Sequence, residues 1–310
     1  MTARPRVVRV VAHAKLNLGL AVGPRRSDGY HEIATVFQSI SLADTLMLRR
    51  RRGRDHLTIR IENAALRGRA GREAIPTGAG NLVWRAARLF HERFEIGGGV
   101  DLRLTKRIPA GSGLGGASAD AAATLVGLAR LHGVRTTTRK LQSLAAELGS
   151  DVPFAVRGGT SLGLGRGERL CRLRLSRPFR GVVAVPPWRV STALAYRRID
   201  RGKYGLTPWH AKLRSAQALG RDGVTTLEAR RLGNTFEKVL GTRRSSFVSL
   251  CSRLRVAGFV GPRLTGSGSA VFASSKDDGE LKAAIKRFTG VERLYAVRSV
   301  SVGTRFVAAP

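Results

Sequence analysis

Cysteine is scarce in this 310-residue sequence, which contains only Cys171 and Cys251. The two residues are far apart, and neither belongs to a pattern with the spacing of metal ligands. The sequence therefore predicts neither a disulfide framework nor a zinc site, and we expect both thiols to be reduced and packed.

Long apolar runs are absent as well. The chain has no run of about 18 apolar residues, the length that a transmembrane helix needs. The first residues, Met-Thr-Ala-Arg-Pro-Arg, lead into a strand-like Val-Val-Arg-Val-Val rather than into the apolar core of a signal peptide. We therefore predict a cytoplasmic protein that has no membrane partner.

Acidic and aromatic residues are also few. The chain has 21 Asp and Glu against 55 Lys and Arg, a net charge of +34, and such an excess is typical of proteins that bind nucleic acids. The arginines are spread along the chain, however, and only Arg49–Arg54 forms a dense cluster, at a predicted hairpin around Gly53. Aromatic residues make up 6% and do not interleave with that cluster. We predict a basic surface that attracts small anions, without a specific nucleic-acid partner.

The hydrophobic content is high enough for packed cores, at 43% of the residues. A chain of this length exceeds one typical core, so we predict two domains, 1–165 and 166–310. Strands and helices occur without regular alternation, which predicts an α+β fold. The expected strands are 6–12, 16–22, 34–40, 45–50, 57–61, 100–105, 180–185 and 293–300, and the stretch 261–273 is expected to place a small-residue loop before a further strand. The expected helices are 82–93, with Asn81 as N-cap, 118–132, 138–148, 191–200, 209–219, 245–257 and 278–288, and 157–167 is typical of turns.

A glycine-rich stretch at 107–122 runs directly into an alanine-rich helix. Glycines allow the backbone to approach an anion closely, and the N–H groups of the first helical turn then point at it, which predicts a phosphate site. No Gly-Lys-Ser/Thr closes the stretch, so it is not a P-loop. A dinucleotide fold is disfavoured because the stretch begins only at residue 107 and no acidic residue follows near position 136. A tight chain reversal without a ligand is the simple alternative.

Lys15 and Asp151 are candidate catalytic residues. Lys15 lies between two apolar strands, where an edge-strand charge is the structural alternative. Asp151 follows a helix end, where a capping or turn carboxylate is the alternative. Facing each other across a cleft, the carboxylate accepts a hydroxyl proton and the ammonium offsets developing charge. With a phosphate on the glycine loop, this arrangement predicts a kinase.

Tyr30 and His31 follow an Asp-Gly turn. The pair either opens a strand or supplies a stacking ring and a hydrogen-bonding imidazole for a heterocyclic base.

Five segments together resemble the ordered motifs of the 4-diphosphocytidyl-2-C-methyl-D-erythritol kinases, a family of the GHMP kinase superfamily. They are Ala12–Leu20, Arg25–Glu32, Ile108–Ala122, Leu148–Phe154 and Leu264–Phe272. The resemblance spans residues 12–273, and the combination of Lys-x-Asn with Asp-Gly-Tyr-His is specific to this member of the superfamily.

The resemblance implies a two-domain GHMP kinase fold, in which an N-terminal nucleotide-binding α+β domain and a C-terminal ferredoxin-like domain enclose the active site. It implies transfer of the γ-phosphoryl group of ATP to the C2 hydroxyl of 4-diphosphocytidyl-2-C-methyl-D-erythritol, in the non-mevalonate route to isoprenoid precursors. The expected cofactors are ATP and Mg²⁺. The expected partner is this small cytidine diphosphate substrate, and the protein is expected to be a monomer or a homodimer.

By motif match, Asp151 is expected to be the catalytic base and Lys15 its partner. Asn17, Tyr30 and His31 are expected to bind substrate, with Tyr196 sandwiching the cytosine against Tyr30. Ser118 is the expected metal ligand. The residues expected around ATP are Pro109, Ala110, Gly111, Ser112, Gly113, Leu114, Gly115, Gly116, Ala117, Ser118, Gly266, Ser267 and Gly268.

Two positions depart from the family pattern. His13 stands where the family usually has proline, which we expect to loosen the strand without removing chemistry. Ala119 stands where a second serine is common, and the missing hydroxyl is expected to weaken metal or phosphate contacts. The remaining alternatives are a GHMP kinase for another small alcohol and an arginine-rich nucleic-acid-binding protein on the same fold.

Overall fold

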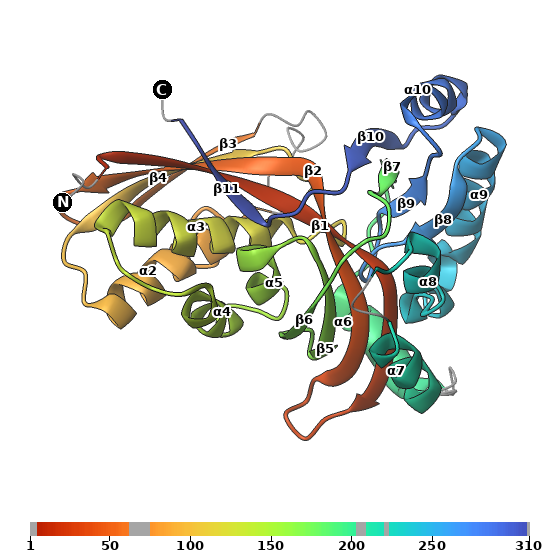
Figure 1. The fold of residues 1–310 in the computed structure, drawn as a ribbon, viewed down its shortest axis with the longest axis horizontal. Coiled ribbons are helices and arrows are strands. Elements are labelled where there is room, and N and C mark those ends of the chain that lie inside the picture. Colours follow the sequence, from red (N-terminus) through yellow and green to blue (C-terminus); the bar gives the residue numbers. More distant parts are fainter. Residues whose placement is uncertain (1–4, 62–74, 203–208, 220–222, 309–310) are drawn as a thin grey trace.

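The computed structural model describes residues 5–61, 75–202, 209–219 and 223–308. Two β-sheets organise them, and the larger one has seven strands in the order β11-β1-β2-β4-β3, with β5 paired to β2 and β6 to β5 (Figure 1). All neighbours are antiparallel except β3 and β4. The strands are β1 (Val7–Arg25), β2 (His31–Arg51), β3 (His56–Ile61), β4 (Gly99–Lys106), β5 (Thr160–Gly165), β6 (Arg169–Leu173) and β11 (Thr304–Val307).

Each of the strands β1 and β2 replaces two predicted strands. The predicted break in β1 fell at His13 and Lys15, because polar residues between apolar runs are typical of a turn. The strand instead continues through register shifts against β2, between His13 and Lys15 and again between Asn17 and Gly19. The polar side chains at this irregularity are buried, so they belong to the interior rather than to a loop.

Four helices cover one face of the larger sheet (Figure 1). They are α2 (Leu82–Phe94), α3 (Gly116–His132), α4 (Thr138–Ala146) and α5 (Val152–Arg157). The Asn81 side chain accepts a hydrogen bond from Val83 N, so the predicted N-cap of α2 is confirmed. Helix α3 is apolar on nearly every side because it lies between the sheet and the other helices, where small alanines permit close packing.

The smaller sheet has the order β10-β7-β9-β8, and all its neighbours are antiparallel. With helices α9 and α10, the chain order is β7, α9, β8, β9, α10, β10, which is the expected ferredoxin-like arrangement. The elements are β7 (Arg180–Val185), α9 (Arg244–Val256), β8 (Val260–Leu264), β9 (Val271–Ser274), α10 (Asp278–Arg287) and β10 (Arg293–Arg298).

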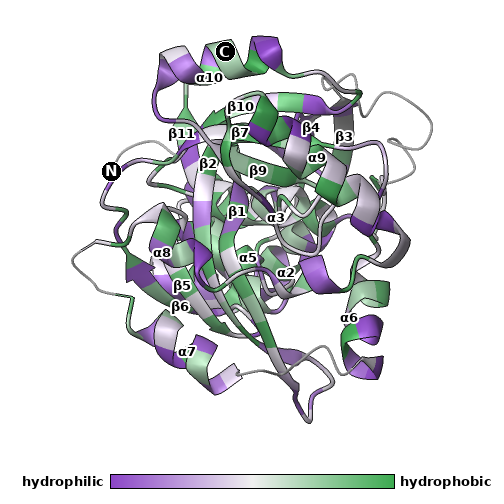
Figure 2. Ribbon diagram, turned by 90° about the vertical axis from the view of Figure 1, so that its right-hand side faces the viewer, coloured by the Kyte–Doolittle hydropathy of each residue, from purple (hydrophilic) through white to green (hydrophobic). Residues whose placement is uncertain are grey.

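The segment between β7 and α9 adds helices α6 (Thr192–Arg201), α7 (Trp209–Gln217) and α8 (Thr226–Arg230), and the 3₁₀ helices η2 (Thr235–Lys238) and η3 (Gly241–Arg243). Helices α6, α7 and α10 lie at the periphery, with hydrophilic and hydrophobic residues alternating along them (Figure 2). In the described ranges, no helix is long and apolar enough to cross a membrane.

The turn-rich passage predicted at 157–167 is largely strand β5. Packing requires a glycine at position 163, because a Cβ there would lie 2.6 Å from the ring of Phe37. Five further elements were not predicted from the sequence: the helices α5 and α8 and the strands β6, β8 and β11. Strands β6 and β11 lie beyond residue 165 and yet pair within the larger sheet, so a domain division at 165 stays a prediction.

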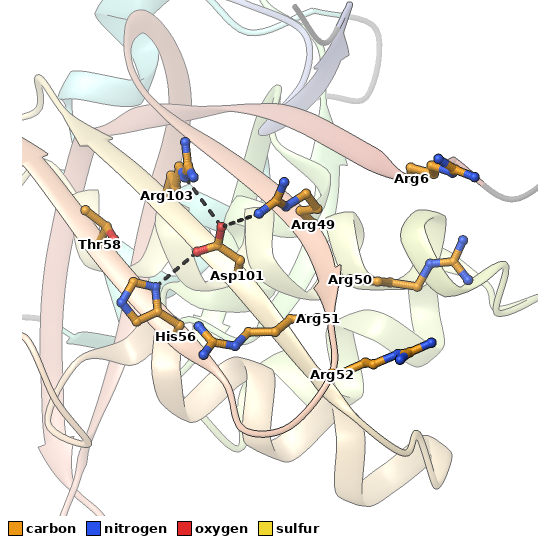
Figure 3. A pocket seen from close by; sticks show the side chains of 9 residues that line it. All are labelled: Arg6, Arg49, Arg50, Arg51, Arg52, His56, Thr58, Asp101 and Arg103. Atoms are coloured by element: carbon orange, nitrogen blue, oxygen red, sulfur yellow. Dashed lines mark hydrogen bonds and ion pairs between the residues drawn. The ribbon is translucent and has the colours of Figure 1, made fainter.

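The predicted hairpin around Gly53 is wrong. A turn exists there, with φ of 83° at Gly53, but β4 lies between β2 and β3 and pairs with β3 in parallel. The arginines at this end line an open cavity of about 1100 Å³. Figure 3 shows Arg49, Arg103 and His56 turned toward the Asp101 carboxylate, which lies 3.1 Å from His56 Nδ1.

Both cysteines are free, as expected, but only one is packed. Cys251 is buried in α9, and burial raises the pKa of its thiol to about 12. Cys171 is exposed on β6, so the prediction of a packed thiol is wrong at that position.

Candidate active site

A cavity of about 770 Å³ is lined by residues from both halves of the chain. Buried apolar residues of both sheets and of the glycine loop pack in one cluster, which contains Leu16 and Leu114 as well as Val183 and Phe272 of the smaller sheet. The site therefore rests on a shared core. The predicted residues that line it are Lys15, Asn17, Tyr30, His31, Gly113, Gly115, Ser118, Asp151, Tyr196, Gly266 and Ser267.

Lys15 and Asp151 form an ion pair in this cavity, with Lys15 Nζ 3.2 Å from Asp151 Oδ2. Lys15 is buried, and its backbone N–H donates to Leu114 O, so it is not a solvent-facing charge on an open strand edge. Asp151 occupies the N-cap position of α5, but its side chain makes no capping hydrogen bond. Both structural alternatives are thus excluded. The lysine side chain is 8% exposed and the carboxylate 32%, so the carboxylate is the more exposed member of the pair, although both line the cavity.

Asn17 holds the lysine in place. Lys15 Nζ donates to Asn17 Oδ1 at 2.6 Å, and Asn17 Nδ2 donates to Thr35 Oγ1 at 2.8 Å. The Thr35 hydroxyl in turn donates to the Gly19 carbonyl. Because every group in this chain is buried and paired, the ammonium has a fixed position beside Asp151.

The glycine loop is clamped between β1 and a second glycine loop at 265–270. Lys15 N donates to Leu114 O, and Ala270 N donates to Ser112 O, each at 3.0 Å. Gly111, Gly113 and Gly115 have φ of 67°, 83° and 69°, the left-handed region that favours glycine. Helix α3 begins at Gly116, two residues before the predicted start, because Gly115 takes the N-cap position.

The first turn of α3 has no side-chain cap, so its N–H groups are open to an anion. The outer side of the loop lines a second, smaller cavity of about 150 Å³ together with Asn81, Lys106 and Asp120. The predicted residues there are Pro109, Ala110, Gly111, Ser112, Leu114, Gly115, Gly116 and Ala117. The loop therefore separates two cavities.

The second glycine loop is held by hydrogen bonds from two other parts of the chain. Asn234 Nδ2 donates to the carbonyls of Leu264 and Gly266 at 2.9 Å each. Thr265 Oγ1 accepts from Asn17 N at 2.9 Å, which ties the loop to β1. Gly268 lines neither of these two cavities, and its N–H donates to Thr265 O within the loop.

A buried cluster anchors the base of the first glycine loop. Lys106 Nζ at the end of β4 donates to Asp44 on β2 and to Asp120 Oδ2 on α3. Asp44 also accepts from the backbone N–H groups of Arg107, at 2.5 Å, and Ile108, at 2.9 Å. The cluster thus connects the two chain segments between which the loop runs.

Burial alone lowers the pKa of Lys106, but the Asp120 and Asp44 carboxylates outweigh it and raise it. Burial also raises the pKa of Asp120, against the opposing effect of Lys106. The two shifts agree when one ammonium lies between two carboxyl groups, because Asp120, whose Oδ1 has no partner, favours the protonated form.

We expect Asp44→Asn to cost about 3–5 kcal/mol of unfolding free energy, because it breaks a buried ion pair. Asp120→Asn should cost less than half as much, because the amide replaces a carboxyl that favours its neutral form. The raised pKa means that Asp120 stabilises the fold below its ordinary pKa of 3.8 and that this contribution is lost as pH rises through the folded pKa. Urea unfolding at several pH values measures both effects. Equal losses for the two variants would contradict the assigned charges.

The other end of the larger cavity carries the aromatic groups. His31 and Tyr196 stack with ring centroids 5.0 Å apart, and Phe236 meets Tyr196 edge-on. His31 Nε2 lies 2.9 Å from Asp200 Oδ1, so helix α6 is tied to the start of β2. Burial, with the Asp151 charge, raises the pKa of Tyr196 to about 12, so its hydroxyl stays protonated at neutral pH.

Tyr30 is exposed, with Arg166 over its ring at 4.9 Å. Arg25 and Arg197 line the same active-site cavity. This end thus combines flat rings with positive charge.

Comparison with known proteins identifies the family. Residues 81–159 match the family described as the GHMP kinases N terminal domain. The 4-diphosphocytidyl-2-C-methyl-D-erythritol kinase of Pelotomaculum thermopropionicum is 40% identical over 87% of this chain and 90% of its own length, and that of Moorella thermoacetica is 40% identical over 87% and 91%. The chain belongs to the 4-diphosphocytidyl-2-C-methyl-D-erythritol kinase family. It is therefore an ATP-dependent GHMP kinase.

Solved structures agree with this family. A crystal structure of 4-(cytidine 5'-diphospho)-2C-methyl-D-erythritol kinase is 34% identical, covers 94% of this chain and 98% of its own, and has a TM-score of 0.67. A homoserine kinase from Cytophaga hutchinsonii reaches a TM-score of 0.72 with 99% of both chains covered, but at 20% identity it supports the fold alone. The predicted two-domain α+β GHMP kinase fold is confirmed.

The two departures from the pattern of the 4-diphosphocytidyl-2-C-methyl-D-erythritol kinase family lie away from the larger cavity. Ala119 is buried in the apolar cluster of the larger sheet and lines neither cavity, so a hydroxyl there would face that core. His13 lies at the β1 register shift, with Nδ1 3.1 Å from the Ile40 carbonyl.

Proposed function

We propose that the protein transfers the γ-phosphoryl group of ATP to the C2 hydroxyl of 4-diphosphocytidyl-2-C-methyl-D-erythritol, in the non-mevalonate route to isoprenoid precursors. The observation that carries the proposal is the Lys15–Asp151 ion pair, which shares one cavity with Gly113, Gly115 and Ser118. An acceptor hydroxyl beside Asp151 then lies next to the phosphate-binding loop.

In the proposed reaction, Asp151 accepts the proton of the C2 hydroxyl as the hydroxyl oxygen attacks the γ-phosphorus, the bond from that phosphorus to the β–γ bridging oxygen breaks, and ADP leaves. Lys15 holds the attacking oxygen and offsets negative charge as the oxygen–phosphorus bond forms. Asn17 keeps the ammonium in position through its 2.6 Å hydrogen bond. The backbone N–H groups of the glycine loop and of the first turn of α3 bind the phosphate oxygens.

We propose that Mg²⁺ enters the site with ATP. Within the described residues, no group of three or more His, Cys, Asp or Glu side chains is arranged to hold a metal ion. A large cluster of side-chain ligands is not required, because proteins usually bind Mg²⁺ through one or two side chains together with substrate phosphates and water. Ser118 lines the cavity beside the glycine loop and is the proposed side-chain ligand. When bound, the ion would neutralise charge on the transferred group.

At the aromatic end, we propose that Tyr30 and Tyr196 enclose the cytosine and that His31 hydrogen-bonds to it. The Asp200 carboxylate orients the His31 ring through its contact with Nε2. Arg166 and the other two arginines of this end would then offset the charge of the diphosphate.

A substrate panel tests the proposal. In a coupled assay with Mg²⁺ and ATP, we expect phosphorylation of the cytidine compound and none of homoserine or galactose. Turnover of either of those alcohols without turnover of the cytidine compound would contradict the assigned substrate.

A pair of variants at Tyr196 tests the aromatic end. We expect Tyr196→Leu to raise the KM for the cytidine compound about tenfold or more, because stacking of a base on an aromatic ring contributes roughly 1–3 kcal/mol. Tyr196→Phe keeps the ring and serves as the matched control, with KM nearly unchanged. The KM for ATP should stay constant in both. A similar KM for the leucine and phenylalanine variants would remove Tyr196 from base recognition.

A further inference from the structure

Another cavity, of about 840 Å³, lies where the chain passes between the two sheets. One wall comes from the β6–β7 connection, including Arg174 and Pro178, and another from the β10–β11 connection at 299–302. Figure 1 shows both connections running from one sheet to the other. The cavity shares no lining residue with the active-site cavity.

Four arginines line this cavity, and no carboxylate does. They are Arg172, Arg174, Arg298 and Arg305. Among the residues that the structure describes, none of the four has an ion pair. The arginine cluster of Figure 3 is different, because the Asp101 carboxylate there lies close to Arg49 and Arg103. This cavity of about 840 Å³ therefore gathers four positive charges that no lining carboxylate compensates.

The remaining lining adds neutral donors around the arginines. Ser41 and Ser301 contribute hydroxyl groups, and the buried His13 lines the cavity as well. Burial, with the nearby Arg305 charge, lowers the pKa of His13, so the imidazole adds no charge at neutral pH. The positive charge of the cavity therefore resides on the guanidinium groups, which bind phosphate through two parallel N–H donors.

The cavity also joins the two connections. Phe179 of the first and Ser299 of the second exchange two hydrogen bonds, Phe179 N to Ser299 Oγ at 3.0 Å and Ser299 N to Phe179 O at 2.8 Å. Arg174 and Arg298 come from opposite sides of this contact, so a ligand that engages both spans the two connections.

We propose that this cavity is a second binding site, separate from the active site, for a small anion that carries two or more phosphate groups. Four guanidinium groups match the charge of such a ligand, and the cavity is large enough for a diphosphate with an organic substituent. A single carboxylate would leave most of that charge uncompensated. Binding relieves repulsion among the arginines and stabilises the junction between the two sheets.

Calorimetric titration of the full chain with inorganic pyrophosphate tests the proposal. The active site also binds phosphate groups, so the second site is identified as the pyrophosphate binding that the variants below weaken. We expect one pyrophosphate per chain at this site and an increase in Tm on binding. Arg174→Gln combined with Arg298→Gln should weaken binding at least tenfold. These side chains are exposed and outside the catalytic site, so kinase activity without pyrophosphate should be unchanged.

Arg50→Gln combined with Arg52→Gln is the matched control, because it removes the same charge at the cluster of Figure 3. It should change the affinity less than twofold. Equal weakening in both double variants would reveal a general charge effect and overturn the proposal, as would unchanged binding in both. If the first double variant does not fold, Arg305→Gln alone replaces it, with the same outcomes.

Discussion

We expect Asp151→Asn to abolish phosphoryl transfer while leaving ATP affinity nearly unchanged. A positioned general base contributes roughly 10²–10⁴ to the rate, and the amide cannot accept the proton. The amide oxygen still accepts a hydrogen bond from Lys15, which lies 3.2 Å from the native carboxylate, so the geometry of the site is kept. Steady-state kinetics with the cytidine compound, and titration with an ATP analogue, measure the two effects separately.

Asp200→Asn is the matched control for Asp151→Asn. It makes the same chemical change in the same cavity, at a carboxylate that contacts His31 rather than Lys15. We expect it to raise the KM for the cytidine compound and to leave most of kcat intact. A variant with asparagine at 151 that retains kcat would remove Asp151 from the base role, whatever the control does.

The residues whose chemistry is hard to explain by packing could be predicted from the sequence. A lysine between two apolar strands and four glycines before a helix each have few structural uses, so their presence pointed to the site. The structure brings Lys15, Asp151 and this glycine loop together around one cavity. Their catalytic and binding roles stay predictions.

The supporting residues could not be predicted, because their partners are far away in the chain. In the sequence, Asp44 and Lys106 are two charged residues that each lie beside an expected strand. Only the pairing of β2 with β4 brings their side chains together. Asp200 on α6 reaches His31 across more than half of the chain. The one signal in the sequence was a carboxylate next to a run of strand-forming residues. The structure places Asp44 inside β2, where it is fully buried and needs partners.

Strand β5 shows a different cause of error. Glycine is depleted in strands, so a glycine-rich stretch is typical of turns. In β5 the glycine at 163 gives room to Phe37, whose ring stacks on Phe154 of α5. Tertiary packing therefore overrides local preference, and it does so beside the helix that carries Asp151 at its start.

We expect Gly113→Ala to lower kcat/KM by about 10² and to destabilise the fold more than Gly111→Ala does. Both glycines have positive φ, so alanine costs roughly 1–2 kcal/mol of backbone strain at either position. They differ in their surroundings: a Cβ at Gly113 would lie 2.4 Å from the Thr265 carbonyl oxygen and 3.1 Å from that of Gly268, whereas at Gly111 the nearest heavy atom is 4.0 Å away.

Backbone atoms cannot move aside as a flexible side chain does, so alanine at 113 must push the two glycine loops apart. The same displacement strains the hydrogen bonds from Ala270 N to Ser112 O and from Asn17 N to Thr265 Oγ1, the latter beside Lys15. A shift of about 1 Å in a catalytic group costs on the order of 10² in rate. Urea unfolding and steady-state kinetics of the two variants measure the effect. Equal destabilisation would mean that the loops separate freely, and that their contact does not hold the lysine in place.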